Sequence, residues 1–328
     1  MKISIIVPVY NEEKTIRKSL NALINQDYPK KDYEIVVVND GSTDNTARIV
    51  KNIARRARVK IRLINLEKNF GRAYAREIGA KKAKYGMLLF IDSRCIAEKD
   101  LLKNLKKINY WPLVGNTYME KNRSIFDYFF SIIRKKFYRD YFGRNFKDVM
   151  LNEENFDKIP KGTGIFFCSK DLFLSSQLKN KTKDISDDTK LLKNILKKKN
   201  ILKTSKARAL YLSRKSFLAN AKHMFARGPK FVDYYFGKNN KISLLFYLFI
   251  LIFSAFLLFL IFSVFYSLKL FLFSLTFLFI LYVGTCIYLS KTPKDFSILF
   301  LLLLPFIFIF YFGCLFGIIK KIKRKNGS

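Results

Sequence analysis

Three long stretches without a charged residue lie in the C-terminal quarter of the chain and constrain its fold more than any other feature. They cover residues 242–267, 270–290 and 296–319, and Phe and Leu dominate each of them. An α-helix rises about 1.5 Å per residue, so about 20 residues span the hydrocarbon core of a bilayer. Buried helices of a soluble core rarely keep this composition over such lengths. The stretches therefore predict an integral membrane protein.

The direction of these segments across the membrane is less constrained. The N-terminal sequence, MKISIIVPVY, is too short and becomes polar too soon for a signal peptide, which predicts a cytoplasmic N-terminal domain. Three crossings would then place the basic residues of the tail, 320–325, on the opposite side, against the positive-inside tendency. Two crossings with one re-entrant or interfacial segment would agree with it. The number of crossings stays open.

The net charge narrows the choice of partners. Lys and Arg total 61 against 25 acids, which gives a net charge of +36. Such a charge suits nucleic acid or an anionic membrane leaflet. The apolar stretches favour membrane lipids. The sequence has no aromatic-basic recognition motif of the kind that nucleic-acid-binding modules use, so we expect no nucleic-acid partner. The four cysteines form no CxxC pair, which is typical of free thiols in a reducing compartment.

The first hundred residues alternate between two patterns. Apolar, β-branched runs cover residues 3–9, 33–38, 59–65 and 87–91, and polar segments with helical spacing separate them. Asn11 is the expected cap of the first helix, Ser42 or Thr43 of the second, and Gly71 opens the third. Strands and helices in alternation predict an α/β domain with a mostly parallel sheet. We expect this domain over residues 1–205.

A second amphipathic pattern precedes the apolar stretches. Between residues 207 and 236, apolar side chains recur at helical spacing between basic ones. This predicts either a helix lying in the membrane interface or a core-facing helix with a solvated basic face. The expected organisation is therefore an amphipathic region at 206–240, membrane segments at 241–320 and a basic tail at 321–328.

Polar residues follow each of the four predicted strands. In open α/β sheets, ligands bind beyond the carboxyl ends of the strands. The four clusters are Val7-Pro8-Val9-Tyr10-Asn11-Glu12-Glu13, Asn39-Asp40-Gly41-Ser42-Thr43-Asp44, Asn69-Phe70-Gly71-Arg72 with Ala75-Arg76-Glu77, and Asp92-Ser93-Arg94. Each cluster alone is a weak signal, whereas four after four consecutive strands indicate one shared ligand site.

These motifs, in this order, resemble the N-terminal signatures of glycosyltransferase family 2, which has the GT-A fold. The resemblance covers roughly residues 2–230 and is strongest to about residue 100. It implies that Asp40 lies near the base of a nucleotide sugar. Pro8, Tyr10 and Glu12 would form the edge of that pocket. The usual family form has two acids where this chain has Asn39 and Asp40.

The resemblance also implies residues for the diphosphate. Gly71 would let the backbone approach the nucleotide closely. Arg72 or Arg76 would face the phosphates, although a solvated helix face is an equally good interpretation of either. The family places an Asp-x-Asp motif after the fourth strand, which binds Mg²⁺ or Mn²⁺, so we expect such a cation here with Asp92 as its ligand. Here the motif reads Asp92-Ser93-Arg94, so either another group completes the metal shell, or Arg94 partly replaces the metal, or activity is weakened.

A later segment resembles the part of the family that acts on the acceptor. Residues 183–191 resemble the Glu-Asp-x-x-Leu element, in which Asp188 matches the general base and Asp187 lies beside it. A helix start decorated with acids is the plainer interpretation. Gly162, Thr163 and Gly164 resemble the strand entry that lines the acceptor pocket.

Together these features predict an inverting transferase that moves a sugar from a UDP- or GDP-sugar to a lipid-linked or membrane-associated acceptor. A non-catalytic, membrane-bound protein that binds sugar nucleotides or glycolipids is the alternative. The Gln-x-x-Arg-Trp motif of processive synthases is reduced to Arg227, and Trp111 is the sole tryptophan, which argues against a polymerase. His223 is expected to pack or to lie at the interface rather than to act in catalysis.

Overall fold

The structure is a computed structural model that describes residues 1–119, 124–138, 141, 143–178, 187–237 and 241–326. The described residues fall into two compact units. The first lies within Met1–Asn122, Tyr138–Lys183 and Asp187–Ser213, and the second within Arg123–Phe137 and Arg214–Ser328.

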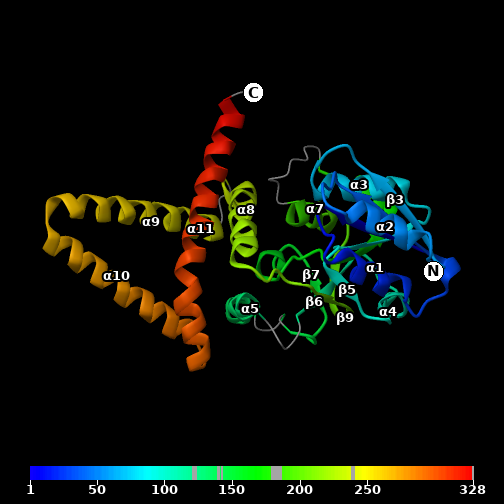
Figure 1. Ribbon diagram of the computed structural model, residues 1–328, viewed down its shortest axis with the longest axis horizontal. Coiled ribbons are helices and arrows are strands. Elements are labelled where there is room, and N and C mark those ends of the chain that lie inside the picture. Colours follow the sequence, from blue (N-terminus) through cyan, green and yellow to red (C-terminus); the bar gives the residue numbers. More distant parts are fainter. Residues whose placement is uncertain (120–123, 139–140, 142, 179–186, 238–240, 327–328) are drawn as a thin grey trace. The chain divides into compact units, whose positions relative to one another are not determined.

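The first unit is built on one sheet with the strand order β3-β2-β1-β4-β8-β6-β9-β5, in which β7 also pairs with β9 (Figure 1). The strands are β1 (Ile3–Val9), β2 (Tyr33–Asn39), β3 (Lys60–Asn65), β4 (Met87–Ile91), β5 (Cys95–Ala97), β6 (Leu113–Tyr118), β7 (Val149–Leu151), β8 (Ile165–Ser169) and β9 (Ile201–Tyr211). The first four pair in parallel, as predicted. From β8 onward parallel and antiparallel pairings mix, so the sheet as a whole is mixed rather than mostly parallel.

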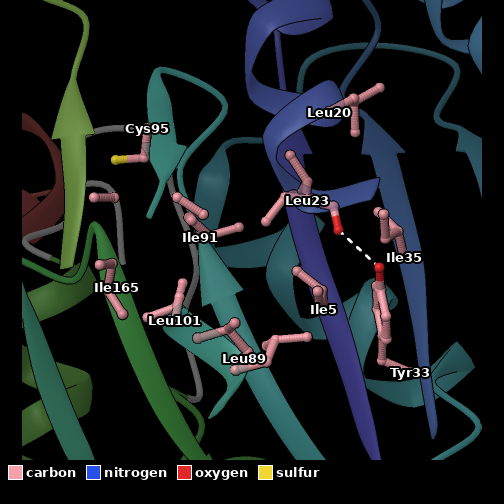
Figure 2. Packing of buried hydrophobic residues seen from close by; sticks show 14 of the residues in the cluster. Ile5, Leu20, Leu23, Tyr33, Ile35, Leu89, Ile91, Cys95, Leu101 and Ile165 are labelled. Carbon is pink, nitrogen blue, oxygen red and sulfur yellow. Dashed lines mark hydrogen bonds between the residues drawn. The ribbon is translucent and has the colours of Figure 1, made fainter. Parts of the chain in front are cut away.

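Helices cover both faces of the parallel half, which is why β1 and β2 are buried along their whole length. The helices of this unit are α1 (Ile16–Ile24), α2 (Thr46–Ala54), α3 (Arg72–Lys82), α4 (Leu101–Ile108), α6 (Lys170–Ser175) and α7 (Asp187–Leu196), with 3₁₀ turns at Lys30–Asp32 and Phe156–Lys158. Alternate residues of β1 and β2, such as Ile5 and Ile35, pack with α1 in the main core (Figure 2). Tyr33 of β2 belongs to the same core, and its hydroxyl donates a hydrogen bond to the carbonyl of Leu23 at 3.0 Å.

The opposite face of the parallel strands carries α3. A Cβ at Gly79 would lie 2.4 Å from Cγ2 of Ile6 and 3.1 Å from Cγ2 of Val38. The absence of a side chain at Gly79 therefore lets α3 approach the sheet closely. This approach places the first turn of α3 directly beyond the carboxyl end of the parallel strands.

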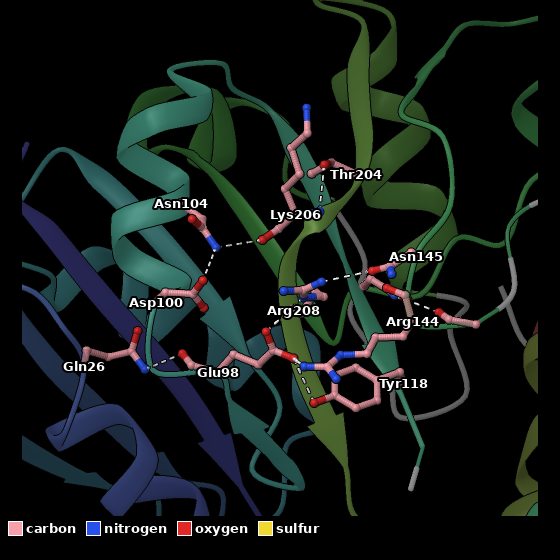
Figure 3. Close-up of polar contacts among 12 residues, drawn as sticks. Gln26, Glu98, Asp100, Asn104, Tyr118, Arg144, Asn145, Thr204, Lys206 and Arg208 are labelled. Atoms are coloured by element: carbon pink, nitrogen blue, oxygen red, sulfur yellow. Dashed lines mark hydrogen bonds and ion pairs between the residues drawn. The ribbon is translucent and has the colours of Figure 1, made fainter. Parts of the chain in front are cut away.

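A partly buried acid ties together the other edge of the sheet. Glu98, just after β5, accepts hydrogen bonds from the Tyr118 hydroxyl at 2.8 Å, from Nε of Arg208 at 2.9 Å and from Arg144 at 3.0 Å (Figure 3). Arg208 also donates to Asn145 at 3.0 Å. Strands β5, β6 and β9 are thus tied to the segment that precedes β7.

The second unit contains the helices α5 (Ile125–Phe137), α8 (Phe217–Tyr235), α9 (Lys241–Tyr266), α10 (Leu268–Leu289) and α11 (Pro293–Asn326). Three of its segments are long and apolar enough to cross a membrane: Ser243–Tyr266, Leu268–Leu289 and Pro293–Lys323. The three predicted apolar helices are therefore present, which indicates membrane association.

Close backbone contact joins α8 to α11 within this unit. A Cβ at Gly228 would lie 2.2 Å from the carbonyl carbon of Gly313, and one at Gly317 would lie 2.6 Å from Cα of Pro229. The glycines let the two helices meet at a spacing that other side chains would prevent. Helix α8 begins at Phe217, later than the expected start of the amphipathic region at residue 206, because β9 continues to Tyr211.

Two of the predicted helix caps are wrong. Asn11 has a φ of 51° and donates its side-chain amide to Thr43, while α1 begins five residues later, at Ile16, after Thr15. Ser42 accepts a hydrogen bond from the backbone N–H of Asn11, and Asn45 precedes α2. The polar residues that were expected to cap helices instead join two loops. Gly71 does precede α3, as predicted.

Candidate active site

The loops after β1 and β2 are interlocked by hydrogen bonds. The backbone N–H of Thr43 donates to Oδ1 of Asn11 at 2.8 Å, and the N–H of Glu12 donates to the Thr46 hydroxyl at 2.9 Å. Tyr10, at the end of β1, stays 44% exposed. Pro8 lies within β1 and pairs with Val38 of β2. The predicted pocket edge is therefore a rigid double loop with an exposed aromatic ring.

Asp40 connects this double loop to the start of α3. One of its carboxylate oxygens accepts from the N–H of Phe70 at 2.8 Å, and the other accepts from the N–H of Gly71 at 2.9 Å. Gly71 has a φ of 99°, which favours glycine. Asp40 thus orients the loop that carries Arg72, and its predicted contact with a nucleotide base stays a prediction.

Two arginines and two acids form the centre of the site. Arg76 is only 3% exposed and donates to Asp188 at 2.6 Å and to Asp92 at 2.9 Å. Arg72 donates to the second oxygen of Asp188 at 2.6 Å and lies 3.8 Å from Asp92. The start of α3, the segment after β4 and the first turn of α7 therefore meet at this cluster.

Thr163 completes this cluster from the segment before β8. Its buried hydroxyl accepts a hydrogen bond from Arg76 at 2.9 Å and donates to Asp188. The Thr163 carbonyl also accepts from Arg76, at 3.2 Å. The flanking glycines differ, because a Cβ at Gly164 would lie 2.8 Å from Thr117, whereas one at Gly162 would meet nothing within 4 Å. Gly164 alone is required by close packing.

Arg94 does not share this cluster's contacts. Its Nη1 donates to Glu12 at 3.1 Å, its Nε donates to the carbonyl of Leu212 at 2.9 Å, and its Nη2 donates to the carbonyl of Ser213 at 3.2 Å. The arginine that replaces the second acid of the motif therefore joins the first loop to the end of β9. Glu12, which was expected at the nucleotide pocket, is its partner.

The donor set fits a divalent cation poorly. Mg²⁺ is typically held by one or two carboxylates together with substrate phosphates and water. The motif supplies only Asp92, and Oδ1 of Asp92 already accepts a hydrogen bond from Arg76. Among the described residues, no three His, Cys, Asp or Glu side chains gather into a possible metal site. The side chain of Asp187, the second predicted acid at α7, lies outside the described residues.

Residues 4–166 match the sequence profile of the family described as Glycosyl transferase family 2. The N-terminal domain belongs to this family. It is 42% identical to the poly(ribitol-phosphate) beta-N-acetylglucosaminyltransferase TarS of Staphylococcus aureus over 105 residues. This aligned stretch covers 32% of this chain and 18% of that protein. The match thus spans less than a fifth of the length of this relative.

Two further proteins extend the comparison. A dolichyl N-acetyl-alpha-D-glucosaminyl phosphate 3-beta-D-2,3-diacetamido-2,3-dideoxy-beta-D-glucuronosyltransferase of Methanococcus voltae is 36% identical over 102 residues, which cover 31% of this chain and 32% of that protein. The solved structure of TarS residues 1–349 with UDP-GlcNAc covers 71% of this chain and 67% of that one, with a TM-score of 0.53 at 22% identity. A mannosyltransferase of Pyrobaculum calidifontis with GDP-Man and Mn²⁺ covers 71% and 63%, with a TM-score of 0.51 at 20% identity. These structures confirm the GT-A fold.

The sequence alone did not predict which of the site residues contact one another. Arg72 and Arg76 are four positions apart, a spacing that puts both on one face of a helix, and this signal was present. The bridging role of Thr163 and the pairing of Arg94 with Glu12 had no local signal, because both join segments far apart in the chain.

Proposed function

We propose that this chain is an inverting glycosyltransferase that moves a sugar from a UDP- or GDP-sugar to a lipid-linked or membrane-associated acceptor. The observation that carries the proposal is the contact of Arg76 with both Asp92, which follows β4 in the part of the chain that matches family 2, and Asp188, in the first turn of α7. The Asp188 carboxylate for the acceptor and the guanidinium groups of Arg72 and Arg76 for the diphosphate therefore lie close enough together to act on a donor and an acceptor bound side by side.

The proposed reaction is a single displacement. The acceptor hydroxyl oxygen attacks the anomeric carbon of the donor, and Asp188 takes the hydroxyl proton. The bond from the anomeric carbon to the phosphate oxygen breaks, and its electron pair stays on the nucleoside diphosphate. Attack opposite the leaving group inverts the anomeric configuration. Tyr10 and the loop at Asp40 are the proposed contacts of the nucleoside.

The membrane part supports the choice of acceptor. Three helices have the length and composition of membrane spans, and the M. voltae relative is named for a dolichyl phosphate glycan. We propose that the family 2 domain lies on the cytoplasmic side, that α8 lies at the membrane interface, and that the product belongs to cell-envelope glycan synthesis. TarS is named for a poly(ribitol-phosphate) acceptor, so a membrane-associated polymer is the other acceptor class to test.

Glycosyltransferases of this fold often use a divalent cation, and the P. calidifontis structure was solved with Mn²⁺. Asp92 would hold such an ion here, and the ion would supply positive charge to neutralise the leaving group. Because the other acid of the motif is Arg94, no step of the proposed reaction is assigned to a metal.

A donor screen tests the proposal. Membranes that contain the full chain are incubated with each common UDP- and GDP-sugar, with and without Mn²⁺, and released nucleoside diphosphate is measured. Release that depends on Asp188 supports the transferase. Tight binding of a sugar nucleotide without turnover of any donor would instead support the non-catalytic binding protein, which the replacement at Arg94 favours.

A further inference from the structure

We propose that Arg72 and Arg76 together take the place of the divalent cation, so that this transferase binds and releases its nucleoside diphosphate without metal. The inference rests on the proposed function and deepens it. It starts from two facts of the donor set: Asp92 is the sole acid of its motif, and Arg94 in that motif is bonded to Glu12 instead.

Both guanidinium groups lie where the phosphates of a donor are expected. Arg72 is the first residue of α3, and Arg76 follows one turn later. The N-terminal end of a helix carries a partial positive charge and attracts phosphate. Asp40 fixes the backbone just before this turn. Two guanidinium groups and one helix N-terminus therefore lie in one small region, where they can face a bound diphosphate.

The two arginines differ in freedom. Arg76 is 3% exposed and contacts Asp92, Asp188 and Thr163, so its position is fixed. The Arg72 side chain is 34% exposed; it donates to Asp188 at 2.6 Å and lies 3.8 Å from Asp92. Because Arg72 is the more exposed of the two, it is the group that can exchange its carboxylate contact for a bound diphosphate, while Arg76 keeps the acids in place.

The charge balance of the reaction couples these groups. In the structure, two guanidinium charges are matched by the carboxylates of Asp92 and Asp188. During transfer, the acceptor proton neutralises Asp188 at the same time as the leaving diphosphate gains one negative charge. The positive charge that Asp188 no longer matches is then available to the leaving group. A metal is not needed for this neutralisation.

The test measures nucleotide binding as well as turnover. UDP and GDP are titrated by calorimetry into the full-length protein in detergent, with EDTA or with Mn²⁺. Arg72→Gln removes one charge from the cluster. Lys81→Gln is the matched control, because Lys81 lies on the same helix and pairs with Glu77 away from the site. Arg72→Lys keeps the charge and separates an electrostatic effect from a folding defect.

We expect EDTA to change the dissociation constant of the tighter nucleotide by less than about twofold, and Arg72→Gln to raise it by about tenfold or more. Lys81→Gln should stay within about twofold of the wild type, and Arg72→Lys should recover part of the loss. Donor turnover should persist in EDTA. Turnover or binding that EDTA abolishes and Mn²⁺ restores would overturn the inference and leave the transferase proposal standing. Failure to bind either nucleotide, with no turnover, would remove both.

Discussion

Arg76 lies 2.6 Å from Asp188 although 112 positions of the chain separate the two residues. The same guanidinium contacts Asp92 at 2.9 Å. Asp40 is bonded to the two backbone N–H groups just before α3, the helix that carries Arg76. The three acids that the sequence assigned to one ligand site are therefore all joined to the first two turns of α3.

Replacing Asp188 with Asn should abolish sugar transfer and leave nucleotide binding nearly unchanged. The amide keeps the size of the side chain but cannot take the acceptor proton, and a general base contributes about 10²–10⁴-fold to rate. The measurement is kcat by nucleotide release, beside the dissociation constant for UDP or GDP. Asp171→Asn, in the first turn of α6, is the control for an acid at a helix start. An Asp188→Asn enzyme with wild-type turnover would exclude the proposed base.

Replacing Thr163 with Val should reduce both activity and stability. The hydroxyl links Arg76 to Asp188 inside a buried site, and leaving such partners unsatisfied costs about 1–3 kcal/mol. Thr163→Ser keeps the hydroxyl and should recover most of the kcat. Activity and thermal midpoint are measured for both variants. Equal kcat values for the Val and Ser variants would show that the hydroxyl does not position Asp188.

The parallel half of the fold could be predicted from sequence because its signals are local. Apolar runs marked β1 and β4 at their observed bounds, and Gly71 marked the start of α3. The antiparallel strands after β4 carried no comparable signal. Strand β5 has three residues, and β9 extends through basic residues that read as an amphipathic helix. Pairing with β6 and β5 determines β9, and that information is not local.

The sequence predicted which residues form the site better than it predicted which of them contact one another. The motifs named Arg72, Arg76, Asp92 and Asp188, and all four meet. The motif position of Arg94 suggested a role at the diphosphate, yet the guanidinium is bonded to Glu12 and to two carbonyls. A motif fixes the backbone position of a residue, whereas the direction of a long side chain depends on partners elsewhere in the chain.

Replacing Arg94 with Gln should lower stability more than it alters donor affinity. The Arg94–Glu12 pair is mostly shielded from solvent, so its loss leaves a carboxylate poorly compensated. The thermal midpoint of the full-length protein should fall, while the KM for the donor changes by less than about twofold. Combining Arg94→Gln with Glu12→Gln should cost less than the sum of the two single changes. A large rise in donor KM at normal stability would instead support a direct contact of Arg94 with the diphosphate.

Replacing Gly79 with Ala should destabilise the family 2 domain by about 1–3 kcal/mol through overpacking. The new Cβ would lie 2.4 Å from a buried methyl group of Ile6, and this outweighs the gain of about 1 kcal/mol in helix propensity. Gly86→Ala is the matched control, since a Cβ there meets nothing within 4 Å. Denaturant unfolding of both variants checks the difference. Equal stability would mean that α3 can move away from the sheet at little cost.

Acid should weaken the second unit through His223. Burial, with the charges of Arg227, Arg214, Lys230 and Arg134, lowers the pKa of His223 from 6.5 to about 2. Between these values the unfolded chain binds a proton that the folded chain does not, so stability is full above pH 6.5 and falls as the pH decreases. The slope is at most about 1.4 kcal/mol per pH unit. His223→Gln should flatten the thermal midpoint between pH 6.5 and 4.5 in detergent; an unchanged slope would assign the effect to other groups.

Helix α5 lies between β6 and β7 in the sequence, yet its buried residues Phe129 and Ile132 pack with Leu299 and Phe306 of α11. A ribosome therefore completes α5 long before it makes the helix that covers it. Until α11 is synthesised, the apolar face of α5 lacks the helix that packs against it. A shortened gene that stops after the last strand would leave it so permanently, and such a product should aggregate unless lipid or detergent is supplied.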